Sequence, residues 1–194
     1  MKLTQLSTLL SVISAETARK VALTNANFAD NRCFKNDNGH GYIAENAING
    51  IKYGQPYLKA QSAQPGVDFT ADFALDENNW QQHDIGEIKF WPFEKCCWNE
   101  YETMKVFIES SSTSIECPPR PSRIYTTGVT LDNIMNSVRN ERPVYFKCPA
   151  GTRGSKIRIS VEDKYQRIQE VEVWTSGSVG IHSVLGIFNS HVWE

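Results

Sequence analysis

The sequence of 194 residues lacks the motifs of the common enzyme and nucleic-acid-binding classes. It contains no G-x-G-x-x-G, G-x-S-x-G, H-E-x-x-H or phosphate-binding-loop pattern, which removes the usual signs of cofactor, serine or zinc chemistry. A formal net charge of -2 argues against a nucleic-acid footprint, which needs a basic patch. No apolar run approaches the length of about 18 residues that a membrane-spanning helix requires. We therefore expect a non-catalytic protein without a transmembrane segment.

Carboxylates offer the one route to catalysis that the sequence leaves open. Asp68 and Asp72, or Glu100 and Glu102, would act as a glycosidase pair only if a cleft held them at the right separation. Acidic residues are common on protein surfaces, so this pattern does not outweigh the missing motifs. We predict that the chain is not an enzyme.

The N-terminal stretch MKLTQLSTLLSVISA has a positive charge at Lys2 and no further charge up to Ala15. This outline predicts a secretory signal within residues 1–16, cut after Ala15, and hence a secreted, extracellular protein. Polar residues dilute the stretch, so a short amphipathic helix or a disordered N-terminus is the other interpretation. We expect the folded domain to cover residues 17–176, and residues 177–194 form a C-terminal extension of unassigned role.

Past the N-terminus the chain reads as short β-strands separated by turns. Four segments are rich in Val, Ile, Tyr and Phe, and several of them alternate apolar with polar residues: 104–108, 143–148, 156–162 and 168–174. Residues 130–140 have helical spacing but lie between strands, so we interpret them as a connecting helical turn. The pattern predicts an all-β fold, an antiparallel β-sandwich of the jelly-roll type.

The chain has five cysteines, and none of their spacings is the C-x-x-C of a zinc site. Cysteines of exported proteins are usually paired. Cys96 and Cys97 are adjacent and would form a strained vicinal disulfide, pair with different partners, or stay reduced on opposite sides of a strand. A bond between Cys117 and Cys148 would close a loop of about 30 residues and contribute roughly 3–4 kcal/mol. Cys33 would then be unpaired.

Five sequence blocks occur in an order that points to a known family. They are KVALTNANFAD, AENAINGIKYG, NNWQQHDIG, the Cys96-Cys97 pair before MKVFIESS, and FKCPAGTRGSKIRISVEDKYQRIQEVEVW. Together, over about residues 20–174, they resemble the F-type lectin (fucolectin) domain, a relative of the discoidin and coagulation-factor C domains. The resemblance implies a jelly-roll sandwich of the galactose-binding-domain-like type and disulfides Cys96–Cys97 and Cys117–Cys148.

Members of this family bind fucose through a histidine, two arginines and the flat face of a vicinal disulfide. This sequence departs from that pattern, because Phe93-Glu94-Lys95 stands in the R-x-D position and Glu100 in the later basic position. Each lost charged donor removes roughly 1.5–3 kcal/mol, so fucose specificity is altered or lost. The resemblance therefore implies a carbohydrate-binding module with these candidate site residues: Phe93, Lys95, Cys96, Cys97, Trp98 and Glu100.

The aromatic residues around the cysteine pair have three interpretations. They stack on the C–H faces of a sugar, they form a protein-contact patch, or they fill the core of the sandwich. The partner is accordingly a glycan or glycoprotein, or, in the alternative, a protein bound by an adhesion module that keeps the lectin fold without sugar binding. Oligomers are compatible with either reading.

The resemblance also implies a calcium site, since the family holds one Ca²⁺ with oxygen ligands near the second block and the last strand. The candidate ligands at the matching positions are the Asn46 carbonyl, the Asn49 side chain, a hydroxyl near Ser62, the Gln169 carbonyl and the Glu170 carboxylate. Asn49 replaces the usual aspartate of the family and removes one negative charge. Glu170 is the sharpest candidate, because alternation alone would leave it an ordinary solvated strand residue.

Overall fold

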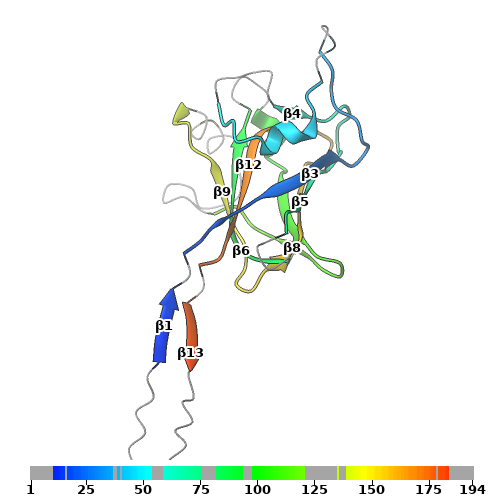
Figure 1. Ribbon diagram of the computed structural model, residues 1–194. Coiled ribbons are helices and arrows are strands. Elements are labelled where there is room, and N and C mark those ends of the chain that lie inside the picture. The colour runs from blue at the N-terminus through cyan, green and yellow to red at the C-terminus, as the bar shows by residue number, and fades with distance from the viewer. Residues whose placement is uncertain are drawn as a thin grey trace, which may run out of the picture.

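A computed structural model describes residues 11–15, 17–36, 39, 41–53, 59–75, 82–93, 98–120, 135, 139–177 and 179–183, and its architecture is shown in Figure 1. For residues 11–15, 98–99 and 179–183 the backbone alone is described. The described residues form antiparallel strands and two short 3₁₀ turns, η1 (Ala44–Ile48) and η2 (Trp98–Tyr101). No helix in this part of the chain is long and apolar enough to cross a membrane.

Two antiparallel sheets make up the sandwich. The first has the order β10-β6-β12-β2, with β4 paired to β12 and β9 paired to β6. Its strands are β10 (Arg153–Gly154), β6 (His83–Pro92), β12 (Arg167–Thr175), β2 (Lys20–Val21), β4 (Ala60–Gln61) and β9 (Val144–Lys147). The second has the order β3-β5-β11-β7-β8. Its strands are β3 (Leu23–Phe28), β5 (Phe69–Phe73), β11 (Lys156–Ser160), β7 (Lys105–Glu109) and β8 (Ser114–Glu116).

Alternation of side chains explains why these segments bury one face each. In β5, Phe69 and Phe73 point inward and are almost fully buried, while the intervening Thr70 and Asp72 are half-buried. In the first sheet, Phe90 is likewise fully buried. Burial of each such side chain contributes about 1.5–3 kcal/mol, and the facing rows form one continuous core. The prediction of an all-β antiparallel sandwich is confirmed.

The predicted bond between Cys117 and Cys148 is present, and both residues are buried in the core. It joins the segment after β8 to the end of β9 and so ties the edge of the second sheet to the first. Among the described cysteines, Cys33 forms no disulfide. Cys96 and Cys97 lie outside the described residues, and the predicted helical turn at 130–140 falls mostly outside them.

A separate two-stranded ribbon extends from the sandwich (Figure 1). Its strands are β1 (Ser11–Ala15) and β13 (Val179–Ser183), which pair antiparallel with Ser11 opposite Ser183. One strand belongs to the stretch predicted as a signal sequence and the other to the C-terminal extension. Cleavage after Ala15 would therefore remove β1 and leave β13 without this partner.

Candidate functional site

One end of the sandwich gathers the residues that the sequence marks as functional. There β6 ends, β12 begins, and η1 and β4 lie against β12 (Figure 1). Register pairs Pro92 with Ile168 and Trp91 with Glu170, so the last residues of β6 meet the first residues of β12. Asn46 in η1 donates its side-chain amide to the Lys59 carbonyl at 3.1 Å and thereby fastens η1 to the strand that follows.

Glu170 is fully buried at this end, on the side of β12 that faces η1. The backbone amide of Gly50 donates to its Oε2 atom at 3.0 Å, while Oε1 has no hydrogen-bond partner in the described part of the chain. Burial raises the pKa of Glu170 to about 7, and the Gly50 hydrogen bond offsets only part of that rise. A buried carboxyl group with an unused oxygen is the kind of group that a cation would stabilise.

The other predicted calcium ligands fall into two groups. Asn49 belongs to the loop that carries Gly50, and its Oδ1 accepts from the Ile51 amide at 2.8 Å. Gln169 reaches the same loop, since its side-chain amide donates to the Ile51 carbonyl at 3.3 Å. The structure thus brings Asn49, Gln169 and Glu170 together around one loop.

The two remaining candidates are Asn46, which was predicted to contribute its backbone carbonyl, and Ser62. The Asn46 side chain is turned to Lys59, as described above. Ser62 Oγ donates to the Gln64 carbonyl at 2.9 Å and accepts from the Gln166 amide at 3.0 Å. Within the described residues no three His, Cys, Asp or Glu side chains form a metal-binding group. A calcium ion here would take most of its six to eight oxygens from backbone carbonyls and amide side chains.

Phe93 is held in place by a buried tyrosine. Its backbone amide donates to the Tyr101 hydroxyl at 3.0 Å, and that hydroxyl donates to the Arg167 carbonyl at 2.5 Å. Tyr101 is buried, and this burial raises its pKa far above the usual value for a phenol. These hydrogen bonds form a clamp that joins the end of β6 and η2 to the start of β12. The end of β6 and η2 flank the segment that carries the cysteine pair.

Phe93 is one end of a column that is formed by three aromatic rings and one ammonium group. Lys59 Nζ lies 3.6 Å from the centre of the Phe93 ring and 4.7 Å from that of Tyr42. Phe34 stacks on Tyr42 with ring centres 5.9 Å apart and planes 6° apart. Phe93 is 4% exposed, whereas Phe34 is 39% exposed and forms the open end of the column. No local pattern in the sequence marks Lys59, Tyr42 or Phe34 as site residues.

Glu100 forms a largely buried ion pair with Arg167. Their side chains are 11% and 15% exposed, and the second carboxylate oxygen of Glu100 is buried without a partner among the described residues. At the position that the resemblance predicts to correspond to a basic residue of the fucolectin pattern, this chain carries an acid whose counter-charge comes from β12. Lys95, Cys96 and Cys97 lie outside the described residues, as does the side chain of Trp98, the first residue of η2.

Three of the four carboxylates considered for catalysis, Asp68, Asp72 and Glu100, form ion pairs. Asp68 accepts from Arg158 at 3.1 Å, and Asp72 lies 3.4 Å from the Lys156 ammonium. Both belong to the second sheet or the segment leading into it. These contacts are typical of a solvated, charge-balanced sheet face. They are not typical of a catalytic pair, in which one carboxyl group acts as an acid and the other as a base or nucleophile.

Comparison with known proteins supports the fold. No family model matches the chain, and no curated protein matches it. A fucose-binding module of Streptococcus pneumoniae, SpX-3, matches with a TM-score of 0.54 and 14% identity over 81% of this chain and 98% of its own. A fucolectin from striped bass (Morone saxatilis) serum matches with a TM-score of 0.57 and 17% identity over 87% of this chain and 50% of its own. Truncated AlyQ, which has CBM32 and alginate lyase domains, matches with a TM-score of 0.51 and 14% identity over 84% of this chain and 34% of its own.

Proposed function

We propose that this chain, which has the β-sandwich fold of fucolectins and related galactose-binding-like domains, is an extracellular carbohydrate-binding module with a specificity other than fucose. The observation that carries the proposal is the column of Phe34, Tyr42, Lys59 and Phe93 at the end of the sandwich where β6 meets β12. Its exposed ring, Phe34, offers a flat apolar face of the kind that packs on sugar C–H groups.

The change of specificity follows from the charges at this end. Fucose recognition in the family depends on arginine donors, whereas here Glu100 and Arg167 neutralise each other. Lys59 is also packed between two rings. Because the Arg167 guanidinium is paired with Glu100, stacking of a sugar on the Phe34 ring suits this arrangement better than recognition by arginine donors.

Calcium completes the proposal. Glu170 fits a calcium site because its carboxylate is buried with one unpartnered oxygen beside the loop that holds Asn49. A bound ion would be held by Glu170, by Asn49 and by backbone carbonyls of this loop and of Gln169. It would compensate the buried charge and fasten the loop after η1 to β12.

A protein-interaction module is the second candidate function. Phe34 and Ile43 favour this function, because these apolar residues are 39% and 45% exposed. Both lie in the segment that contains the bridge between Lys35 and Gly41. Exposed aromatic and branched apolar residues on a projecting segment are common at protein contacts.

A glycan array probed with and without EDTA tests the proposal. We expect calcium-dependent binding to at least one glycan that lacks fucose. Silence across the array, from protein that is folded by circular dichroism and loaded with calcium, overturns the carbohydrate proposal and leaves the protein-interaction module. Binding restricted to fucosylated glycans overturns the change of specificity alone.

A further inference from the structure

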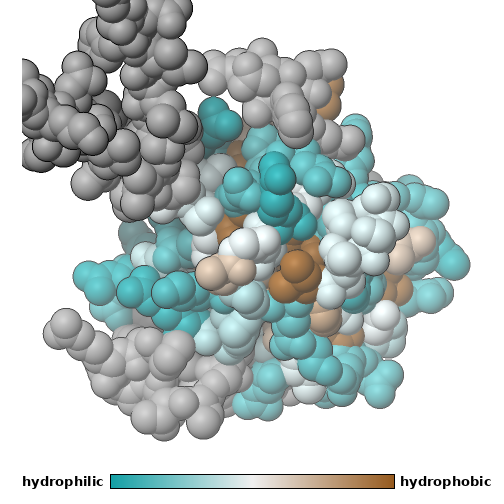
Figure 2. All heavy atoms as spheres, turned by 90° about the horizontal axis from the view of Figure 1, so that it is seen from below, coloured by the Kyte–Doolittle hydropathy of each residue, from teal (hydrophilic) through white to brown (hydrophobic). Residues whose placement is uncertain are grey.

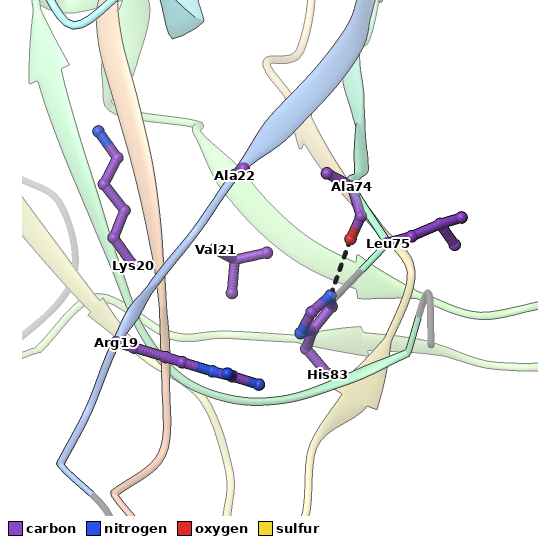
Figure 3. A pocket seen from close by; sticks show the side chains of 7 residues that line it. All are labelled: Arg19, Lys20, Val21, Ala22, Ala74, Leu75 and His83. Atoms are coloured by element: carbon purple, nitrogen blue, oxygen red, sulfur yellow. Dashed lines mark hydrogen bonds between the residues drawn. The ribbon is translucent and has the colours of Figure 1, made fainter. Parts of the chain in front are cut away.

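The outer face of the first sheet carries charged side chains that the proposed glycan site does not use. Side chains alternate along each strand, and the inward set includes Ile88, Phe146 and Val173, all buried in the core. Figure 3 shows this alternation in β2, where Lys20 and Val21 leave opposite sides of the strand. The outward side chains are set in two rows across the sheet by the register of its strands. One row is Lys147, Glu87, Trp174 and Lys20, and the other is Tyr145, Lys89 and Glu172.

Glu172 holds two ammonium groups at one place. The Nζ atoms of Lys20 and of Lys52, which comes from the loop after η1, each lie 3.1 Å from its Oε1 atom. The Glu172 side chain is 7% exposed, whereas those of Lys20 and Lys52 are 43% and 45% exposed. The two lysines therefore cover the carboxylate, and each ammonium group, which has three donors, stays within reach of a further anion.

A second carboxylate, that of Glu87, is shared in the same way. Lys89 Nζ lies 3.9 Å from Glu87 Oε1, and Arg120 Nη1 lies 3.6 Å from Glu87 Oε2. The Arg120 backbone amide donates to the Tyr145 carbonyl at 2.7 Å, which places Arg120 beside β9. Lys147 is exposed on β9 and has no ion-pair partner in the described part of the chain. We call Lys20, Lys52, Lys89, Arg120 and Lys147 together the basic face.

Positive charge is in excess here, because the five cations of the basic face are set against the carboxylates of Glu87 and Glu172. Glu170, the other acid on this side of β12, is fully buried and does not reach the surface. Asp84, at the start of β6, is paired with Arg153 at 2.9 Å. Excess positive charge on one face of a chain with a formal net charge of -2 is typical of a surface that attracts polyanions.

Two tryptophan rings hold lysines of the basic face in place. Lys89 Nζ lies 4.0 Å from the centre of the Trp174 ring, whose Nε1 atom donates to Glu172 Oε2 at 3.2 Å. Lys52 Nζ lies 4.5 Å from the centre of the Trp91 ring. Because these ammonium groups already lie over rings, they lose less conformational freedom on binding an anion than unrestrained lysines would.

The spread of the cations fits a chain of anionic groups better than a single one. β9, β6, β12 and β2 are neighbours, so three strand spacings, about 14 Å, separate Lys147 from Lys20. Four of the five cations are lysines, whose point charges suit sulfate and carboxylate groups at many angles, whereas the forked arginine favours phosphate. The end of the sandwich next to this face is hydrophilic, with small apolar areas between polar residues (Figure 2). A lipid surface, which takes up apolar side chains, suits such surroundings less well.

We propose that the basic face binds a linear acidic polysaccharide, which carries sulfate or carboxylate groups along its length. The basic face covers the broad side of the first sheet, whereas the proposed glycan site lies at the end where β6 meets β12. Binding at the basic face requires neither Phe34 nor calcium, so the two proposals can fail independently.

Isothermal titration of the full-length protein in EDTA with heparin and with polygalacturonate tests the proposal. Heparin carries sulfate and carboxylate groups, and polygalacturonate carries carboxylates alone. Dextran is the neutral control, and single-stranded poly(dT) is a polyanion of another class. We expect at least one acidic polysaccharide to bind, more weakly as salt is added, and dextran not to bind. Preference for heparin assigns the bound group as sulfate, and preference for polygalacturonate assigns it as carboxylate.

Three results of this titration overturn the proposal. They are binding of neither acidic polysaccharide, equal binding of dextran, and tighter binding of poly(dT), which would assign the basic face to nucleic acid.

The double variant Arg120→Gln, Lys147→Gln separates this face from general attraction of anions. Its matched control is Lys105→Gln, Lys156→Gln, which also removes two positive charges but from the second sheet. We expect affinity for the bound polysaccharide to fall at least about five-fold in the first double variant and less than about two-fold in the second. Equal losses in both, or no loss in the first, would overturn the assignment to the basic face.

Discussion

Glu170 and Glu172 lie two residues apart on the same face of β12, yet their carboxyl groups have opposite electrostatic surroundings. Glu170 has one backbone donor, and burial raises its pKa to about 7. Burial acts on Glu172 in the same direction. However, ammonium groups of Lys52 and Lys20, each at 3.1 Å, outweigh that effect and hold the pKa of Glu172 below its usual value.

The first prediction concerns the pH dependence of stability without calcium. Because the pKa of Glu170 is higher in the folded than in the unfolded protein, its protonation stabilises the fold below about pH 4.5. That contribution is lost as the pH rises through about 7. The full effect is about 3 kcal/mol. Urea unfolding at pH 5 and pH 8 in EDTA measures this fall in the free energy of unfolding. Glu170→Gln should remove the part of the fall that Glu170 causes. An unchanged pH profile in Glu170→Gln would contradict the assignment.

Glu172→Gln is the matched variant, and its effect has the opposite sign. The pKa of Glu172 is depressed in the folded state, so its stabilisation is present above the pKa of the unfolded protein and is lost as the pH falls through the folded value. We expect Glu172→Gln to lower the free energy of unfolding at pH 7 and to have little effect at pH 3. Equal behaviour of the two variants would show that the contrast between the carboxyl groups is not real.

Calcium binding is predicted to offset the free-energy cost of burying the charged Glu170 carboxylate. At free calcium one hundred times the Kd, binding adds about 3 kcal/mol of stability. For a domain of this size that raises Tm by about 5–10 °C. Scanning calorimetry with calcium and then EDTA measures the change, and affinity should increase as the pH rises through 7, since the carboxylate must be deprotonated. A calcium-induced rise in Tm that survives in Glu170→Gln would place the ion elsewhere.

Loss of the Cys117–Cys148 disulfide is predicted to destabilise the fold without changing it. The bond joins residues 31 apart in sequence, which corresponds to about 3–4 kcal/mol of loop-closure entropy in the unfolded chain. The double variant Cys117→Ala, Cys148→Ala should show this loss in urea unfolding. Cys33→Ala is the control, because Cys33 forms no disulfide among the described cysteines. A loss below about 1 kcal/mol would contradict the entropic account.

Tyr101→Phe is predicted to loosen the clamp around the cysteine-containing segment. Removal of the hydroxyl leaves the Phe93 amide and the Arg167 carbonyl without their shared partner, at a cost of about 1–3 kcal/mol. Tyr145→Phe is the control, since this ring is 37% exposed and its change should stay within about 0.5 kcal/mol. Equal urea midpoints for the two variants would show that the clamp does not stabilise the fold.

The strands with regular alternation could be predicted from sequence, and the others could not. The segments 104–108, 143–148, 156–162 and 168–174 overlap β7, β9, β11 and β12. β6 lacks a clear signal at its end because Phe90, Trp91 and Pro92 are buried in succession. Trp91 is buried on the outer face of the sheet because Lys52, in the loop after η1, lies over its ring.

The candidate site was only partly visible in sequence because its contacts join distant segments. The family resemblance pointed to Glu170, which the structure shows to be buried, whereas alternation alone would leave it solvated. Lys59 and Arg167 could not be found, since each becomes part of the site only when β4 and β12 bring it beside Phe93 or Glu100. Glu100 is not an isolated buried charge, because Arg167 forms an ion pair with it.

The most direct test of the account is a glycan array probed in calcium with the unmodified protein, Phe34→Ser and Leu75→Ser. Phe34 and Leu75 are both exposed apolar residues, but only Phe34 belongs to the aromatic column, and Leu75 lies at the other end of the sandwich. We expect the unmodified protein and Leu75→Ser to bind the same fucose-free glycan, and Phe34→Ser to bind it several-fold more weakly. Absence of any glycan binding by folded, calcium-loaded protein would contradict it.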